Sequence, residues 1–162
     1  MGGAAFVVCG IGSLDGACIR WAAQEEETRL DGPFEILSLS GSLSQRGAHL
    51  DMAISDAQGN VLGGHMCYGN RVRTTAEVLV ARLEGWVLDR ELDEQTGYHE
   101  LIIVPRTRGG GPAGAPFLID VTFAVIRLRA PYFIDSSVSR AARADADGTS
   151  AARTDDDSKR CS

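Results

Sequence analysis

Two histidines and one aspartate could bind a metal ion if the chain forms a β-hairpin around the loop sequence DAQGN. This loop is typical of a type I turn followed by a glycine in the left-handed conformation, here Gly59. Such a turn pairs Ser55 with Val61, and the same register places Asp51 directly opposite His65. Facing side chains on adjacent strands lie about 5 Å apart at Cβ, which is close enough for them to share a ligand.

The alternation of apolar residues supports this register independently. Even-numbered positions on both sides of the loop are apolar, and this period of two indicates that one face of the hairpin is buried. The even-numbered apolar residues are Leu50, Met52, Ile54, Leu62, Met66 and Tyr68. His49, Asp51 and His65 therefore share the opposite face, where two imidazoles and a carboxylate suit Zn²⁺ with an open fourth position. A solvated polar face with a His–Asp hydrogen bond fits the same pattern, and a slip of one residue would disperse the three side chains.

Other catalytic chemistry has little support. Cys67 falls opposite His49 in this register, but a thiol in a strand more often serves packing than a Cys–His pair. The serines have no G-x-S-x-G setting. The G-x-G at Gly10 and Gly12 lacks a third glycine and a following helix, so it indicates a tight turn between strands rather than a dinucleotide site. We identify no catalytic and no cofactor-binding residue.

The elements that must position these residues are short apolar segments separated by turn residues. They predict a mainly antiparallel β-sheet with few helices. The predicted strands are residues 4–11, 17–23, a segment after Pro33 that Gly41 interrupts, 49–55, 61–68, 86–91 and 98–104, and residues 74–83 could be strand or helix. Gly97 suits the left-handed position that closes a second hairpin loop.

Length and composition indicate one domain in a chain of 162 residues. We expect a folded domain at 4–105, a Gly/Pro-rich loop at 106–116, an additional strand at 117–130 and a disordered tail at 136–162. No apolar run reaches the roughly 20 residues of a membrane span, and the N-terminus lacks the basic region of a signal peptide. We therefore expect an intracellular protein, with cytoplasm and nucleus equally open.

Charge argues against direct binding to nucleic acid. Sixteen basic and twenty-two acidic residues give a net charge of −6. Residues 1–135 carry 11 arginines and 17 acids, so the whole deficit (11 − 17 = −6) lies outside the predicted tail. Proteins that bind DNA through its phosphates usually present a basic surface, so we expect no direct DNA binding by this chain alone, although a local basic patch could still exist. The four cysteines form no C-x-x-C motif, which argues against a zinc ribbon or a disulfide framework.

Five segments together resemble the PPC domain, a module shared by plants and prokaryotes that plant AT-hook nuclear-localized proteins also carry. They are GIGSLDGACIRW (10–21), GPFEILSLSGSLS (32–44), AHLDMAISDAQGNVLGGHM (48–66), TTAEVLV (74–80) and RELDEQTGYHELII (90–103). The resemblance runs from about residue 6 to residue 104. Family members usually begin with a strand and a helix before the segment that matches AAFVVCGIGSL. We therefore expect either an N-terminal truncation or a replacement of that strand, in part, by FLIDVTFAVIRLR (117–129).

The resemblance implies an α+β fold with a mainly antiparallel sheet, similar to that of acetolactate decarboxylases, and a homotrimer. Because an antiparallel sheet leaves edge strands and apolar faces that need cover, we expect the trimer to bury TTAEVLV and part of FEILSLS. Prokaryotic members typically show H-x-H followed by GGH, three histidines that hold a metal. The matching positions are His49, Asp51 and His65, with Asp51 replacing one imidazole, and Zn²⁺ is the expected cofactor.

The function implied is that of an interaction and regulatory module without demonstrated catalysis, which reaches DNA only through partner proteins. The AT-hook core Arg-Gly-Arg-Pro is absent, so the direct DNA binding of the plant proteins does not carry over. A zinc-dependent hydrolase or lyase acting on a small molecule is the alternative.

Overall fold

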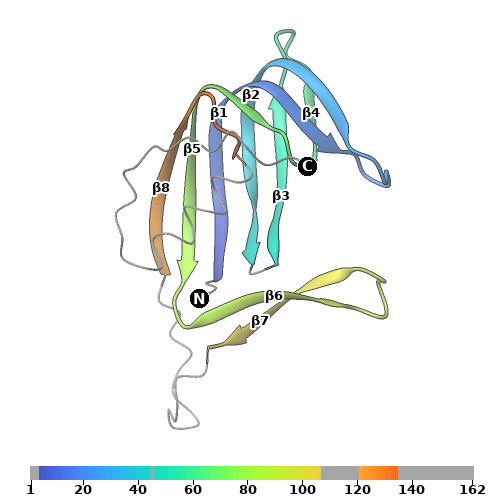
Figure 1. Cartoon of the computed structure of the whole chain (residues 1–162), viewed down its shortest axis with the longest axis vertical. Coiled ribbons are helices and arrows are strands. Elements are labelled where there is room, and N and C mark those ends of the chain that lie inside the picture. The colour runs from blue at the N-terminus through green and yellow to red at the C-terminus, as the bar shows by residue number, and fades with distance from the viewer. Residues whose placement is uncertain (1–3, 45, 107–120, 135–162) are drawn as a thin grey trace, which may run out of the picture.

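The computed structural model describes residues 4–44, 46–106 and 121–134, and these residues form eight strands (Figure 1). The strands are β1 (Ala4–Arg20), β2 (Thr28–Ser44), β3 (Gly47–Ser55), β4 (Val61–Met66), β5 (Arg71–Leu83), β6 (Trp86–Leu92), β7 (His99–Pro105) and β8 (Val121–Arg129). Every pairing between them is antiparallel, which confirms the predicted fold class. Residues 107–116 of the predicted loop and the predicted tail lie outside the described residues. No helix in the described part of the chain is long and apolar enough to cross a membrane.

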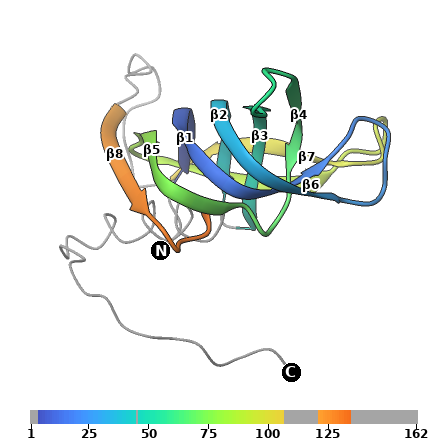
Figure 2. The ribbon, with the colours of Figure 1, turned by 90° about the horizontal axis from the view of Figure 1, so that it is seen from above.

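Six strands form one strongly curled sheet in the order β2-β3-β4-β1-β5-β8, and β2 also pairs with β1. The long strand β1 therefore contacts β2 along one edge, and β5 and then β4 along the other. This double pairing closes β1, β2, β3 and β4 into a ring, and Figure 2 shows the curl from above. The remaining strands, β6 and β7, form a separate hairpin that runs across the lower ends of the sheet in Figure 1.

The hydrophobic core lies inside the curl. The even-numbered residues of β3 predicted to face inward are almost fully buried, with exposures of 0–2% for Leu50, Met52 and Ile54. Leu14 and Ile19 of β1 meet them from the other side of the ring, and both are fully buried. Because alternate residues of each strand enter this core, the odd-numbered residues of β3 are left on the outer face.

The strand β1 differs from the sequence prediction of two strands joined by a turn. It runs unbroken for 17 residues, and Gly10 and Gly12 lie within it. Its pairing with β5 shifts register on both sides of this region, which marks β-bulges rather than a turn. Gly12 has a φ of +149°, and a Cβ there would lie 2.5 Å from the carbonyl oxygen of Thr75. The glycine thus serves close strand packing. The strand β2 likewise continues through Gly41, which was predicted to interrupt it.

Candidate metal centre

The β3–β4 hairpin has the predicted register. Asp51 pairs with His65 and Ser55 pairs with Val61, as the apolar alternation indicates. Gly59 has a φ of +82°, and its amide donates a hydrogen bond to the carbonyl oxygen of Asp56 at 3.0 Å. The local sequence therefore determines which side chains of the hairpin share a face.

The side chain of Asp56 fixes the turn itself. Its Oδ1 accepts hydrogen bonds from the amides of Gln58 at 2.9 Å and Asn60 at 2.8 Å, and its Oδ2 accepts one from the Asn60 side chain at 2.8 Å. These hydrogen bonds lower the pKa of Asp56 because they favour the charged carboxylate, and the bond from the Asn60 side chain has the largest effect. An ionised Asp56 thereby stabilises the turn that sets the register.

His49, Asp51 and His65 come together on the outer face of this hairpin. One potential ligand atom from each lies within 4.8 Å of the other two. The two imidazole rings are 4.7 Å apart between centroids and tilted by 49°. His65 Nδ1 lies 3.6 Å from Asp51 Oδ1, and the side chains of His49 and Asp51 are exposed while His65 is half-buried. The arrangement offers two imidazole nitrogen donors and one carboxylate oxygen donor.

The surroundings of His65 fit a metal ligand. Its Nδ1 is buried and has no hydrogen-bond partner among the described residues, since 3.6 Å to Asp51 is too long. Burial is the largest cause that lowers the pKa of His65; the charges of His49 and Arg20 lower it further, and Asp51 opposes them. A lowered pKa keeps the imidazole neutral near pH 7, which is the form that coordinates metal.

Some side-chain movement must accompany binding. Two ligands of a tetrahedral Zn²⁺ lie about 3.4 Å apart, given ligand distances of about 2.1 Å, whereas these atoms spread over as much as 4.8 Å. His49 and Asp51 are exposed and can change rotamer without disturbing the core. The residues present therefore fit a single divalent ion after a small inward rotation.

Cys67 does not join this group. It would lie opposite His49 if the β3–β4 pairing continued beyond His65, but the pairing stops there. The β3–β4 ladder ends at Asp51 and His65, and the amide of Cys67 donates instead to the carbonyl oxygen of Cys18 at 3.0 Å. The Asn70 carboxamide bridges the two cysteines: its Oδ1 accepts from the Cys18 amide at 2.9 Å, and its Nδ2 donates to the Cys67 carbonyl at 2.6 Å. No hydrogen bond links Cys67 to His49 within the described residues.

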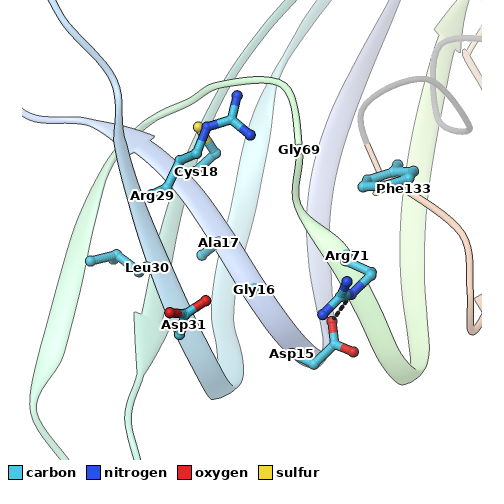
Figure 3. Close-up of a pocket in the computed structure, with 10 residues that line it drawn as sticks. All are labelled: Asp15, Gly16, Ala17, Cys18, Arg29, Leu30, Asp31, Gly69, Arg71 and Phe133. Carbon is cyan, nitrogen blue, oxygen red and sulfur yellow. Dashed lines mark hydrogen bonds and ion pairs between the residues drawn. The ribbon is translucent and has the colours of Figure 1, made fainter.

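A cavity of about 290 Å³ that sequence reasoning missed opens between β1, β2 and the start of β5 (Figure 3). Two arginines line it, and each already has a carboxylate partner. Arg71 Nε lies 2.6 Å from Asp15 Oδ1, and Arg29 Nη2 lies 2.8 Å from Glu27 Oε1. Asp15 and Arg71 are 56 residues apart in the chain, so no local pattern could have indicated their meeting.

Comparison with known proteins identifies similar sequences. Residues 2–84 match the model of the Plants and Prokaryotes Conserved (PCC) domain, the module abbreviated PPC above. A curated relative, the bifunctional protein GlmU of Synechococcus sp. (strain JA-3-3Ab), is 45% identical over 100 residues, which is 62% of this chain. The matched region covers only 16% of that relative, so this chain spans about a sixth of its length.

Two solved structures are similar in both fold and sequence. A hypothetical protein from Salmonella enterica is 42% identical with a TM-score of 0.63, over 65% of this chain and 76% of that one. A metal-containing protein from Archaeoglobus fulgidus is 32% identical with a TM-score of 0.51, over 61% of this chain and 73% of that one.

Proposed function

Because this chain belongs to the Plants and Prokaryotes Conserved domain family, we propose that it works as a homotrimeric interaction and regulatory module with one divalent metal ion. The ion is held by His49, Asp51 and His65, and Zn²⁺ suits this donor set best. The observation that carries the proposal is the convergence of the three ligand atoms within 4.8 Å. The metal content named for the Archaeoglobus fulgidus protein supports it.

Each residue has a distinct part in this centre. His65 is the anchor, because its buried, unpartnered Nδ1 gains a partner when the ion binds. Asp51 supplies a negative charge that offsets part of the charge of the ion, and His49 completes the group from the exposed side. Gly64 lets β4 approach β1, since a Cβ there would lie 2.6 Å from the carbonyl oxygen of Arg20. A bound Zn²⁺ would supply a Lewis-acidic centre with an open coordination position.

Metal analysis of the purified full chain tests the centre. We expect about one Zn²⁺ per wild-type chain at pH 7.5 and none in His65→Ala, whose fold should persist because the core lies on the other face. Asp51→His should bind Zn²⁺ more tightly, since it adds a third imidazole. Occupancy in the wild type should fall as the pH drops through about 6, where imidazole becomes protonated.

His99→Ala is the matched control for His65→Ala. His99 is the third histidine of the chain and lies at the exposed start of β7, outside the metal group. This variant should retain the wild-type metal content. Equal zinc in wild type and His65→Ala would refute the metal centre.

The outer face of the sheet supports the proposed trimer. Exposed or half-buried apolar residues occupy neighbouring outward positions on β1, β5 and β8, and we name them the apolar outer face: Cys9, Ile11, Leu79, Phe123 and Val125. Phe123 and Val125 are 62% and 70% exposed. Contiguous exposed apolar surface of this kind marks sites of protein association. Other residues of TTAEVLV, which was predicted to be buried in the trimer, already fill the core of the single chain.

Association with DNA is proposed to run through partner proteins. The net charge of −6 opposes direct contact with phosphates, so the regulatory role would depend on protein contacts. A duplex-binding titration at physiological salt should show no affinity tighter than the non-specific range of about 10⁻⁴ to 10⁻⁶ M.

A zinc-dependent hydrolase or lyase is the second candidate function. The exposure of His49 and Asp51 favours it, because a small molecule could reach an ion held there. Turnover of p-nitrophenyl acetate by zinc-loaded wild type, lost in His65→Ala, would support this candidate over the non-catalytic module.

A further inference from the structure

Arg20 lies beside the candidate metal centre. It is the last residue of β1 and pairs with His65 across the β1–β4 ladder. Directly opposite residues of an antiparallel pair point to the same face, with Cβ atoms about 5 Å apart. Arg20 therefore shares the outer face with His65 and with Asp51, which pairs with His65 from the other side. One row of three adjacent strands carries a guanidinium, an imidazole and a carboxylate.

This guanidinium differs from others in the structure in having no acidic partner. Arg29 and Arg71, drawn in Figure 3, are ion-paired with Glu27 and Asp15. Arg20 Nη1 donates to the backbone carbonyl oxygen of Gln24 at 3.1 Å, but no carboxylate lies within 4.0 Å of its nitrogens in the part of the chain that the structure describes. Because a guanidinium has five N–H donors, most of its hydrogen-bonding capacity remains for a ligand.

The charge of Arg20 reaches the metal group. Arg20 lies directly opposite His65 in the β1–β4 ladder, so its positive charge is on the same face as the proposed ligands. The hydrogen bond to Gln24 holds the guanidinium at the end of β1, where the strand begins to leave the sheet. The positive guanidinium of Arg20 is thus kept next to the residues that would bind the metal ion, which is a second positive charge. Two adjacent positive centres on an exposed face attract an oxyanion.

We propose that Arg20 and the metal ion together bind the carboxylate group of a small molecule. The proposal rests on the metal centre proposed above and names the class of ligand that this centre would take. Arg20 contributes N–H donors to the carboxylate, while the open coordination position takes part of its charge. A singly charged carboxylate suits the site better than a phosphate dianion, because Asp51 places a negative charge in the same row.

Anion titration of the Co²⁺-loaded full chain tests the proposal, with acetate as probe and the visible Co²⁺ absorption as readout. Metal content is measured first on every variant. Wild type should show a saturable spectral change with acetate, and Arg20→Gln should weaken the affinity about tenfold or more while retaining full metal content. Arg20→Lys keeps the charge but loses the planar fork, so it should fall between the two.

Arg129→Gln is the matched control, because it removes the same charge from β8, which lies at the other end of the sheet from β3 and β4. It should bind acetate as the wild type does. Equal acetate affinity in Arg20→Gln and wild type, loss of metal from Arg20→Gln, or tighter binding of phosphate than of acetate would each overturn the proposal. Absence of metal from wild type would refute the metal centre itself and the carboxylate site with it, and the metal assay alone would show this.

Discussion

At the scale of single residues, the burial of His65 costs stability in the folded chain and favours metal binding. The packing of β4 against β1 and β3 buries its Nδ1 without giving it a hydrogen-bond partner. A buried polar atom left without a partner costs stability, and metal coordination is one way to satisfy it. The same burial keeps the imidazole neutral and ready to coordinate. The chain thus bears a local cost at the residue that would anchor the ion.

This cost predicts a pH dependence for the metal-free protein. The folded-state pKa of His65 lies below its unfolded value of about 6.5, so the unfolded chain takes up a proton first as the pH falls. The contribution of His65 to stability is therefore present above pH 6.5 and is lost as the pH falls toward the lower folded-state pKa. Thermal unfolding in chelator from pH 7.5 to 5 should show a smaller loss of Tm in His65→Gln than in wild type. An unchanged pH slope in His65→Gln, with His99→Gln as control, would contradict this origin.

Cysteine reactivity offers a second test at this scale. Burial is the main cause that raises the pKa of Cys18 to about 11, with Glu27 adding to it, and burial also raises the pKa of Cys67. Because the thiolate is the reactive form, both should resist alkylation, whereas Cys9 is exposed on β1. Brief treatment of dilute, dissociated chains with iodoacetamide at pH 8, followed by peptide mass mapping, should label Cys9 before Cys18 and Cys67. Faster labelling of Cys18 than of Cys9 would contradict the structure at the β1–β4 junction.

At the scale of elements, the hairpin was predictable and the long strands were not. The β3–β4 register depends on a short turn and on an alternation of period two, and both are local, so His49, Asp51 and His65 could be grouped from the sequence. The bulges of β1 depend on its partner β5, which lies far along the chain. Gly10 and Gly12 therefore resembled a turn. The Arg20–His65 pair was missed for the same reason, since it needs the β1–β4 pairing.

The close packing at Gly12 can be separated from its backbone conformation. Gly12 and Gly47 have similar φ values of +149° and +141°, but a Cβ at Gly12 would collide with the backbone of β5, whereas one at Gly47 would meet nothing within 4 Å. Both Gly→Ala variants introduce backbone strain because of the positive φ, and only Gly12→Ala adds a steric clash. We expect Gly12→Ala to lower the free energy of unfolding by about 1–3 kcal/mol more than Gly47→Ala. Urea titration measures the difference, and equal losses would show that the bulge can relax.

At the scale of the whole molecule, one strand connects the fold to the proposed function. The inward residues of β1 fill the core, its last residue lies beside the metal group, and its outward residues Cys9 and Ile11 belong to the apolar outer face. The metal group and this face therefore lie on the same side of one curled sheet. Assembly through the face would place copies of the centre in a fixed relation to one another, which suits a module that regulates through contacts.

The oligomeric state is the prediction that tests this view of the molecule. Stable interfaces bury on the order of 800 Å² per partner around an apolar centre, and the apolar outer face supplies such a centre on β8. Sedimentation velocity of the full chain at micromolar concentration should give a species of three 17.2 kDa chains. Val125→Glu should dissociate it, because a carboxylate would be buried at the interface without a partner. Thr122→Glu adds the same charge on the other side of β8 and should leave the trimer intact. A wild-type monomer, or equal dissociation by both variants, would exclude this face as the assembly surface.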